Sequence, residues 1–285
     1  MEIKYKILLI ILVVAVSGCT DLPGSSNSET SSTGANAENG GLEILSFQTA
    51  QSELREGQKT QLKLTLRNHH VEEISMESIE IYNYEPLIPE KNQGNWEDRC
   101  TPSQIRRNLQ SNPPTITCEW TVEAPEEIGD FNSKTAKPKL QILYNSKVSN
   151  SQNPVNLQFK PFEDISSNSA ETKEVDNGEV KLSISAENPA PIDTGSKVDV
   201  SLQNSGHGEV IEESENSLYT VNVEPKSLFD DRCNSEMDLN PPIDDTAEFS
   251  CIANSESADQ VERKLLVSAS YKYQKTPTTN IQVVK

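Results

Sequence analysis

Four of the five cysteines of this chain form two pairs with identical spacing. Cys100 precedes Cys118 by the same number of residues as Cys233 precedes Cys251. The second cysteine of each pair falls on an alternating apolar run and should face a core, whereas the first lies in a polar segment rich in turn residues. We expect one disulfide in each pair, which would tie a long loop to the inner face of the next strand. In the chain-entropy model, closing such a loop contributes about 3 kcal/mol.

A metal site is the rival chemistry for these cysteines, and the sequence does not favour it. The chain has no Cys-x-x-Cys motif, the two pairs lie far apart along the chain, and no histidine is near either pair. The three histidines are His69, His70 and His207, in equivalent turns after a strand-ending asparagine. Adjacent histidines on a strand or turn point to opposite sides. We therefore expect surface-loop histidines without chemistry, and no metal ligands.

The acidic pairs of the chain do not follow a known calcium-binding pattern, and catalytic motifs are missing from the sequence. Glu97-Asp98, Asp230-Asp231 and Asp244-Asp245 do not form the Asp-x-Asp-x-Asp-Gly calcium loop, so solvated loops are favoured over irregular calcium ligands. The chain lacks the nucleophile, zinc-hydrolase and phosphate-binding motifs, and three histidines leave little acid–base capacity near neutral pH. We predict no catalytic residues, no cofactor and no enzymatic activity.

Each first cysteine follows an Asp-Arg step, with an aromatic residue shortly before it. Trp96 precedes Asp98-Arg99, and Phe229 precedes Asp231-Arg232. The Asp-Arg steps are interpreted as a structural ion pair or a backbone clamp. The aromatic residues are candidate contact residues, since an aromatic at the tip of a disulfide-held loop can anchor a partner. The interpretation that we favour is that each fills a small core under its loop.

These features recur in order because the chain is an internal duplication. Both copies contain, in sequence, a glycine before alternating apolar residues, a Glu-Pro step, Asp-Arg-Cys, Asn-Pro-Pro and the second cysteine. Period-2 alternation dominates, which predicts all-β antiparallel sandwiches. A short helix is expected at 102–110, after Pro102. Strands are expected at 42–50, 60–68, 74–84, 115–122, 138–145, 154–160, 178–186, 196–204, 217–224, 246–253, 262–273 and 278–284.

The run from Gly195 to Asn204 has the pattern Gly-x-x-Val-x-Val-x-Leu-x-Asn. It resembles the start of a CARDB-type, immunoglobulin-like module of bacterial and archaeal surface proteins. The first copy matches more loosely, with two extra residues between Gly57 and Asn68. The resemblance covers most of 42–160 and 178–285 and implies two immunoglobulin-like β-sandwiches. The cysteine pairs are not part of the general pattern of that family.

The N-terminus has the composition of a secretion signal. Lys4 and Lys6 precede an apolar run at 7–16, which as a helix spans about 15 Å, half of the hydrocarbon thickness. Ser17 and Gly18 before Cys19 resemble the lipobox of prokaryotic lipoprotein precursors, which implies a diacylglyceryl group on Cys19 and cleavage before it. The alternative is an ordinary signal peptide that ends near a cysteine.

The resulting organisation has five parts. We expect a signal peptide at 1–18, a lipidated cysteine and Ser/Gly/Asn tether at 19–40, a sandwich at 41–160, a linker at 161–177 and a second sandwich at 178–285.

The formal net charge of −19 would repel nucleic acid. We therefore predict an extracytoplasmic lipoprotein, held to the membrane through Cys19, that binds a protein or glycan at the cell surface without catalysis. An accessory subunit of a surface assembly, such as a pilus or secretion complex, is the alternative. A metal-dependent hydrolase is the remote one.

Overall fold

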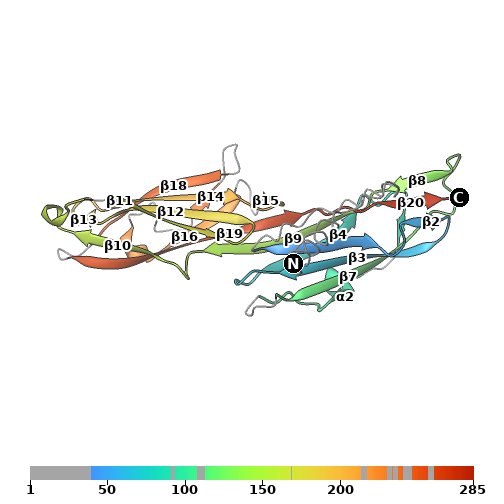
Figure 1. The fold of residues 1–285 in the computed structure, drawn as a ribbon, viewed down its shortest axis with the longest axis horizontal. Coiled ribbons are helices and arrows are strands. Elements are labelled where there is room, and N and C mark those ends of the chain that lie inside the picture. Colours follow the sequence, from blue (N-terminus) through green and yellow to red (C-terminus); the bar gives the residue numbers. More distant parts are fainter. Residues whose placement is uncertain are drawn as a thin grey trace, which may run out of the picture. The chain divides into compact units, whose positions relative to one another are not determined.

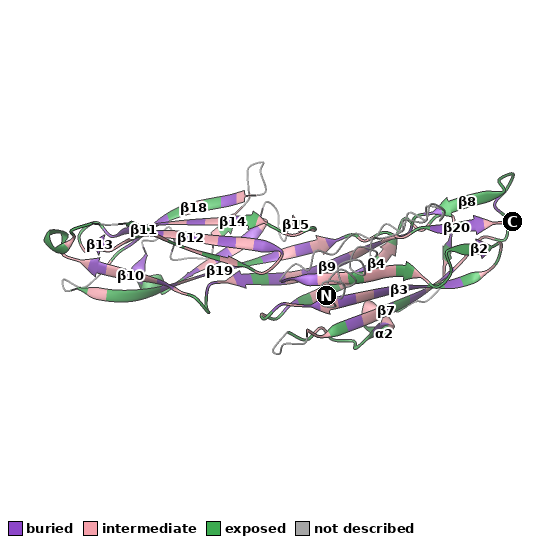
Figure 2. Ribbon diagram, viewed as in Figure 1, coloured by how far each residue is buried: buried purple, intermediate pink, exposed green. Residues whose placement is uncertain are grey.

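The computed structural model describes residues 40–90, 94–107, 113–167, 169–212, 217–229, 233, 237–239, 246–255 and 260–285. In these residues the fold is almost entirely antiparallel β, which confirms the all-β, immunoglobulin-like sandwich class (Figure 1). The main strands lie within a few residues of those expected from the alternation. Along β3, for example, Leu62, Leu64 and Leu66 are fully buried while the residues between them reach solvent (Figure 2).

The first repeat supplies two facing sets of strands. One sheet has the order β1-β3-β7-β5, with β6 also paired to β7, and includes β1 (Leu42–Thr49), β3 (Lys59–Asn68), β5 (Ile88–Pro89), β6 (Cys100–Thr101) and β7 (Thr115–Glu123). The facing strands are β2 (Glu53–Arg55), β4 (Ser75–Tyr82), β8 (Ser133–Ala136) and β9 (Lys139–Ser149).

The second repeat follows the same plan. One sheet has the order β11-β12-β14-β18, formed by β11 (Ser169–Asp176), β12 (Val180–Asn188), β14 (Ser196–Asn204) and β18 (Thr246–Ala253). The facing strands are β13 (Ala190–Pro191), β15 (Glu209–Ile211), β16 (Tyr219–Glu224), β17 (Met237–Leu239) and β19 (Val261–Lys275). The remaining elements are α2 (Trp96–Arg99), the 3-10 turns η1 (Phe162–Asp164) and η2 (Lys226–Leu228), and the last strand of each repeat, β10 (Val155–Lys160) and β20 (Ile281–Val284).

The last strand of each repeat pairs with strands of the other repeat. Strand β10 runs antiparallel to β19 and parallel to β13, both in the second repeat. Strand β20 runs antiparallel to β8 and parallel to β2, both in the first repeat. In Figure 1 the red β20 accordingly lies beside β2 and β8 from the early part of the chain. Each sandwich is therefore completed by a strand that the other repeat supplies.

Side-chain amides hold the exchanged strand β10 in place. The side chain of Asn188 accepts a hydrogen bond from Gln158 N at 2.9 Å and donates one to Asn156 O at 2.8 Å. The buried Asn150, just before β10, donates to Leu265 O at 3.1 Å and accepts from Val267 N at 2.7 Å. The side chains of both asparagines thus satisfy backbone N–H and C=O groups that would otherwise need water, at the point where the chain crosses from one repeat to the other.

The two long strands β9 and β19 also pair directly, with Tyr144 opposite Tyr273. Backbone hydrogen bonding therefore continues from one repeat into the other through an eight-stranded sheet. The expected domain boundaries, 41–160 and 178–285, follow the repeats along the chain. That each of these two ranges is a domain that folds on its own remains a prediction.

Two segments differ from the sequence-based expectation. Residues 169–176, expected to lie in a linker, form β11 and pair with β12 along their whole length. Their mostly polar side chains stay exposed or half-buried, so this edge strand carries no hydrophobic signal. The helix expected at 102–110 is absent from residues 102–107, and 108–110 lie outside the described residues. Instead α2 ends at Arg99, and β6 is extended up to Pro102, as the residue before a proline prefers.

Candidate functional site: a buried carboxylate where the repeats meet

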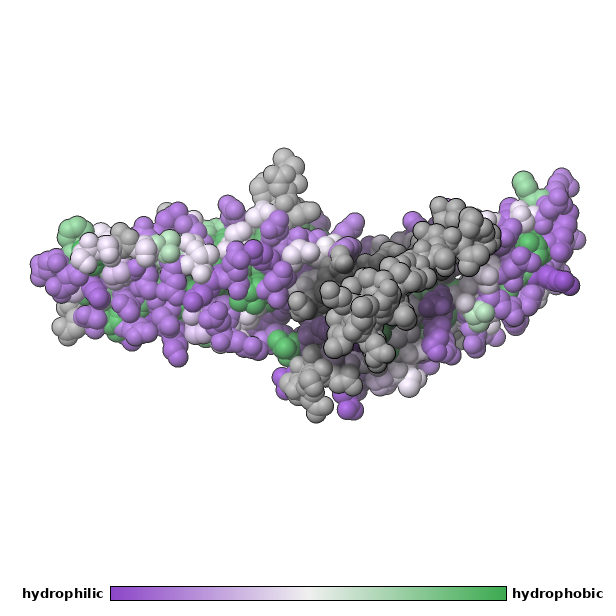
Figure 3. Space-filling model, viewed as in Figure 1, coloured by the Kyte–Doolittle hydropathy of each residue, from purple (hydrophilic) through white to green (hydrophobic). Residues whose placement is uncertain are grey.

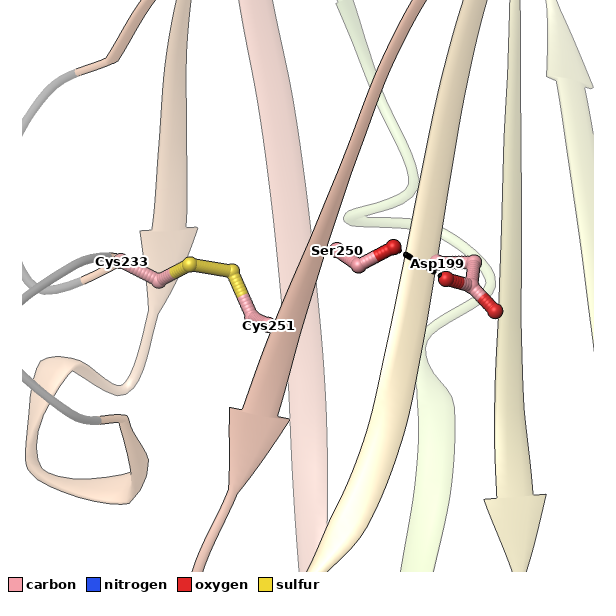
Figure 4. Close-up of a disulfide and its surroundings, with 4 residues drawn as sticks. All are labelled: Asp199, Cys233, Ser250 and Cys251. Carbon is pink, nitrogen blue, oxygen red and sulfur yellow. Dashed lines mark hydrogen bonds between the residues drawn. A yellow bond between two sulfur atoms is a disulfide. The ribbon is translucent and has the colours of Figure 1, made fainter.

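Both predicted disulfides are present. Cys100 is bonded to Cys118 and Cys233 to Cys251, each across a sequence separation of 18, and all four side chains are buried. The second cysteine of each pair faces the core from β7 or β18. Figure 4 shows that Cys251 and its neighbour Ser250 lie on opposite sides of β18, with Ser250 bonded to Asp199 of β14. The predicted lipid site, Cys19, lies outside the described residues.

The Asp-Arg step of the first repeat clamps the backbone of the disulfide loop. Asn95 N donates to Asp98 Oδ2 at 3.3 Å at the start of α2, and Arg99 Nη2 donates to Gly94 O at 2.6 Å. These bonds match the backbone-clamp interpretation. Asp231-Arg232 of the second repeat lies outside the described residues.

The two candidate contact aromatics pack inward rather than project. Phe229 is 7% exposed, and its backbone forms a bridge with Ala253 of β18. Trp96 is half-buried and packs against the main core. Both aromatics therefore pack into or against the main core, rather than into a separate small core under each loop, and the exposed part of Trp96 is the surface that remains for a contact.

The prediction that the histidines occupy surface turns without chemistry is wrong for His70. Its side chain is 1% exposed, and its Nε2 lies 3.0 Å from Oε1 of Glu179, a residue of the other repeat. His69 has a different partner, since its Nε2 lies 2.9 Å from Glu43 Oε2, and its side chain is partly exposed. The turn pattern around the strand-ending asparagine did not reveal that the second repeat covers one of the two histidines.

Glu179 is the centre of a closed group of polar side chains. Its carboxylate accepts hydrogen bonds from Leu42 N at 3.0 Å, from Tyr144 Oη and from Tyr271 Oη at 3.3 Å, besides His70. An ionised carboxylate can only accept, so Nε2 of His70 carries the hydrogen. Leu42, His70 and Tyr144 belong to the first repeat, and Glu179 and Tyr271 to the second. The carboxylate thus bonds both repeats at once.

The backbone around Glu179 is shaped by a tight turn. The side-chain oxygen of Asn177 accepts hydrogen bonds from Glu179 N at 3.1 Å and Val180 N at 2.9 Å. Gly178 has φ +83°, and a Cβ there would overlap the backbone of Gly40. Glycine is therefore required where the two segments touch, both for the left-handed conformation and for the close approach.

The aromatic rings around the carboxylate form a continuous series. His70 lies edge-on to Tyr144, with ring centroids 6.3 Å apart, and Tyr144 lies 5.8 Å from Tyr273. Tyr273 is 6.1 Å from Tyr271, which is 6.1 Å from Tyr219. Three of these four pairs are edge-on and the Tyr144–Tyr273 pair is tilted, and edge-on arrangements are favourable for aromatic pairs. The series excludes water from the carboxylate.

Electrostatics keep this group in one protonation state. Burial alone would raise the pKa of Glu179, but the charge and hydrogen bond of His70, the charge of Lys275 and the hydrogen bond from Tyr144 outweigh it and lower that pKa. Burial, and then the charge of Glu179, raises the pKa of Tyr144 well above its ordinary value. The pKa of Tyr271 is raised well above its ordinary value for the same two reasons. The carboxylate stays charged and the phenols stay neutral donors.

A second feature lies at the surface, in a groove between β4 and the segment that contains α2. Its volume is about 530 Å³, within the range of roughly 300–1,000 Å³ that is common for ligand pockets. Ile81, Tyr84 and Trp96 are among its lining residues. Four glutamates and one arginine also line it: Glu77, Glu80, Glu90, Glu97 and Arg99.

In the described residues, no group of three or more histidine, cysteine, aspartate or glutamate side chains is placed to hold a metal ion. No helix there has the length and hydrophobicity of a membrane span. On the face drawn in Figure 3, most described residues are hydrophilic and the hydrophobic ones are scattered.

No family model and no curated protein matches the chain, so the resemblance to CARDB-type modules stays a prediction from the residues. Among solved structures, a collagen adhesin of S. aureus matches at 10% identity, over 85% of this chain and 92% of that one, with a TM-score of 0.20. The Enterococcus faecalis MSCRAMM ACE, described as binding its ligands by the collagen hug model, matches at 8% identity over 85% and 95% of the two chains, also with a TM-score of 0.20. A TM-score of 0.20 does not show a shared fold, and the immunoglobulin-like class is based on the strand order of the two repeats.

Proposed function

We propose that the protein is a membrane-anchored surface protein that displays two interlocked immunoglobulin-like repeats for non-catalytic binding. The observation that supports this most strongly is the closed group around Glu179. Its carboxylate, imidazole and phenols are buried and bonded to one another across the two repeats. A substrate cannot reach them, so their chemistry serves to join the repeats.

Two other features support an extracytoplasmic location. Two disulfides form and persist in oxidising compartments. The lipobox-like sequence before Cys19 would supply two acyl chains, which is enough for stable anchoring. Residues 19–40 would then act as a flexible tether between the membrane and the sandwiches.

An accessory subunit of a surface assembly is the second candidate, and one observation favours it. In the described part of the chain, β4 pairs with β9 on one side only, which leaves a strand edge that a partner can extend. The metal-dependent hydrolase has no comparable support.

The anchor and the binding role are tested separately. For the anchor, the N-terminal peptide of the mature protein is analysed by mass spectrometry, and Cys19→Ser is compared with the wild type. Lipidated Cys19 in the wild type and release of the variant from membranes are expected. An unmodified N-terminus that begins elsewhere would remove the anchor from the proposal.

For binding, the full-length protein is crosslinked in intact cells and its partners are identified by mass spectrometry. We expect one recurring partner that is lost with a repeat-junction variant such as Glu179→Ala. A hydrolytic activity that chelation abolishes and zinc restores would overturn the non-catalytic role.

A further inference from the structure

Building on the proposed binding role, we propose that the groove beside β4 binds an extended, positively charged segment of a partner protein, which adds a strand to the free edge of β4. The occupant is defined by three features of the groove: an open strand edge, an excess of carboxylates and an aromatic wall.

The strand edge supplies the backbone part of the interaction. β4 pairs with β9 from Tyr82 opposite Lys139 to Ser75 opposite Asn145. In the part of the chain that the structure describes, its other edge has no strand partner and opens into the groove. An exposed edge carries a row of backbone donors and acceptors, which an extended peptide satisfies most completely.

The charges of the groove select a basic segment. The carboxylate of Glu77 is already bound to Lys272 Nζ at 2.8 Å, and this bond lowers its pKa. Glu80, Glu90 and Glu97 remain, against the single guanidinium of Arg99. Arg99 donates to Gly94 O and also attracts Glu80, so it offsets at most one of these three charges. Lysine or arginine side chains spaced along a strand would pair with these carboxylates. The net charge of −19 would also speed the approach of a basic partner.

The aromatic side chains supply the apolar part. Tyr84 and Trp96 both line the groove. Aromatic faces attract ammonium and guanidinium groups, and their edges pack against the aliphatic stems of lysine and arginine. The role of Trp96 then combines the two interpretations that its sequence position allowed, because one part of the ring packs on the core and the other part faces the groove.

The protein's own tether does not fit this description. Residues 20–40 contain Asp21, Glu29 and Glu38 and no lysine or arginine. Glu80, Glu90 and Glu97 would repel such a segment, so the charge of the groove selects a segment of another molecule.

The test uses the full-length protein in detergent micelles and a fluorescein-labelled peptide of four Lys-Val repeats, with binding followed by fluorescence anisotropy. A Glu-Val peptide of equal length tests charge. A Lys-Val peptide that is N-methylated at alternate residues tests strand addition, because it lacks the backbone donors on one edge. We expect the Lys-Val peptide to bind at least about tenfold more tightly than either control peptide.

The matching protein variants separate the groove from the general acidity of the chain. Glu80→Lys with Glu97→Lys reverses two charges in the groove, and Glu209→Lys with Glu248→Lys makes the same change at two exposed strand positions elsewhere. The groove variant should weaken binding by about tenfold or more, and the control variant by less than about twofold. Circular dichroism confirms that both variants remain folded.

Three results would overturn the proposal. They are equal weakening by the two double variants, undiminished binding of the N-methylated peptide, and no binding of the Lys-Val peptide. Failure here, with a recurring crosslinked partner in cells, would leave the proposed function intact and move the contact elsewhere. Peptide binding without a cellular partner would instead support the groove and count against the proposed function.

Discussion

The two repeats place different residues at equivalent positions of their junction. In the first, the residue before β1 is Gly41, and its carbonyl accepts a hydrogen bond from His69 N at 2.9 Å. In the second, the residue before β12 is Glu179, and its carbonyl accepts from Ser205 N at 2.8 Å. The backbone bonds are the same, but one side chain is missing and the other carries the buried charge. The backbone of the two repeats is therefore equivalent at this position, but the side chains are not.

The tyrosines that face each other at the junction show the same contrast. Tyr273 keeps its hydroxyl within its own repeat, where it donates to Asn204 Oδ1 at 3.1 Å and accepts from Gly208 N at 2.9 Å. Tyr144 instead donates to Glu179 across the junction. Gly206, at the position equivalent to His70, leaves the room that the Tyr273 hydroxyl occupies. Divergence of the copies has thus produced one bonded centre rather than two.

Removing the carboxylate should have the largest effect on stability. Glu179→Ala leaves the buried Leu42 N–H, His70 and Tyr144 without their acceptor, and each buried donor left unpaired costs about 1–3 kcal/mol. Urea denaturation measures this loss in the free energy of unfolding. The control is Glu174→Ala, whose partner Lys181 is 2.9 Å away at the surface and whose loss costs about 0–1 kcal/mol. Equal losses in the two variants would show that the junction is not a bonded centre.

Removing either disulfide should cost about 3 kcal/mol, the same in both repeats because both close loops of equal length. The structure adds a sharper expectation. Both tryptophans, Trp96 and Trp120, lie in the first repeat, so tryptophan fluorescence reports unfolding there. Because the last strands are exchanged, replacing Cys233 and Cys251 by alanine should shift this transition as far as replacing the first pair does.

Independent sandwiches would behave differently. In that case, loss of the second disulfide would leave the tryptophan transition in place, and only circular dichroism would record a change. That outcome would contradict the mechanical coupling of the repeats by β10 and β20.

A smaller difference should separate the two central tyrosines. Tyr144→Phe removes a hydrogen bond to a charged group and should cost about 2 kcal/mol, whereas Tyr273→Phe removes neutral bonds and should cost about 1 kcal/mol. Both phenylalanines keep the ring, so packing is matched between the variants. Urea denaturation again measures the difference. A larger cost at Tyr273 would place the main bonded centre in the second repeat.

Most of the fold could be predicted from the sequence, because buried strands carry their own signal. Strands such as β3 and β14 alternate cleanly, and the disulfides followed from the repeated spacing. The polar edge strand β11 lacks that signal. The helix near Pro102 was misplaced because a proline suits a first helical turn but also favours an extended conformation in the residue before it, and the extended β6 prevailed.

The junction could not be predicted for a different reason. Glu179 and His70 are 109 positions apart, and neither has a distinctive neighbour pattern. Their proximity depends on which repeat supplies the last strand of each sandwich. Alternation assigns a strand to a face of a sheet but not to a partner strand, so the exchange of β10 and β20 left no trace in the local sequence.

The pH dependence of stability provides the last and smallest test of the asymmetry. Because the pKa of Glu179 is lower in the folded protein than its ordinary value of 4.5, the unfolded chain takes up the proton first as the pH falls. The stabilisation that this group contributes is therefore complete above pH 4.5 and is lost as the pH falls through the folded-state pKa. One proton changes the free energy of unfolding by at most about 1.4 kcal/mol per pH unit.

Glu77 and Asp199 also have lowered pKa values, so the wild-type slope contains their contributions as well. Comparison with Glu179→Gln isolates the contribution of the junction, because glutamine keeps the shape of the side chain but has no carboxyl group to titrate. The slope below pH 4.5 should be shallower in Glu179→Gln by the share of one group. At high pH the sign reverses, since the raised pKa values of Tyr144 and Tyr271 make stability fall as the pH rises above 10.0. An unchanged acid slope in the variant would mean that the carboxylate is already protonated in the folded protein, and that the junction is held by neutral hydrogen bonds.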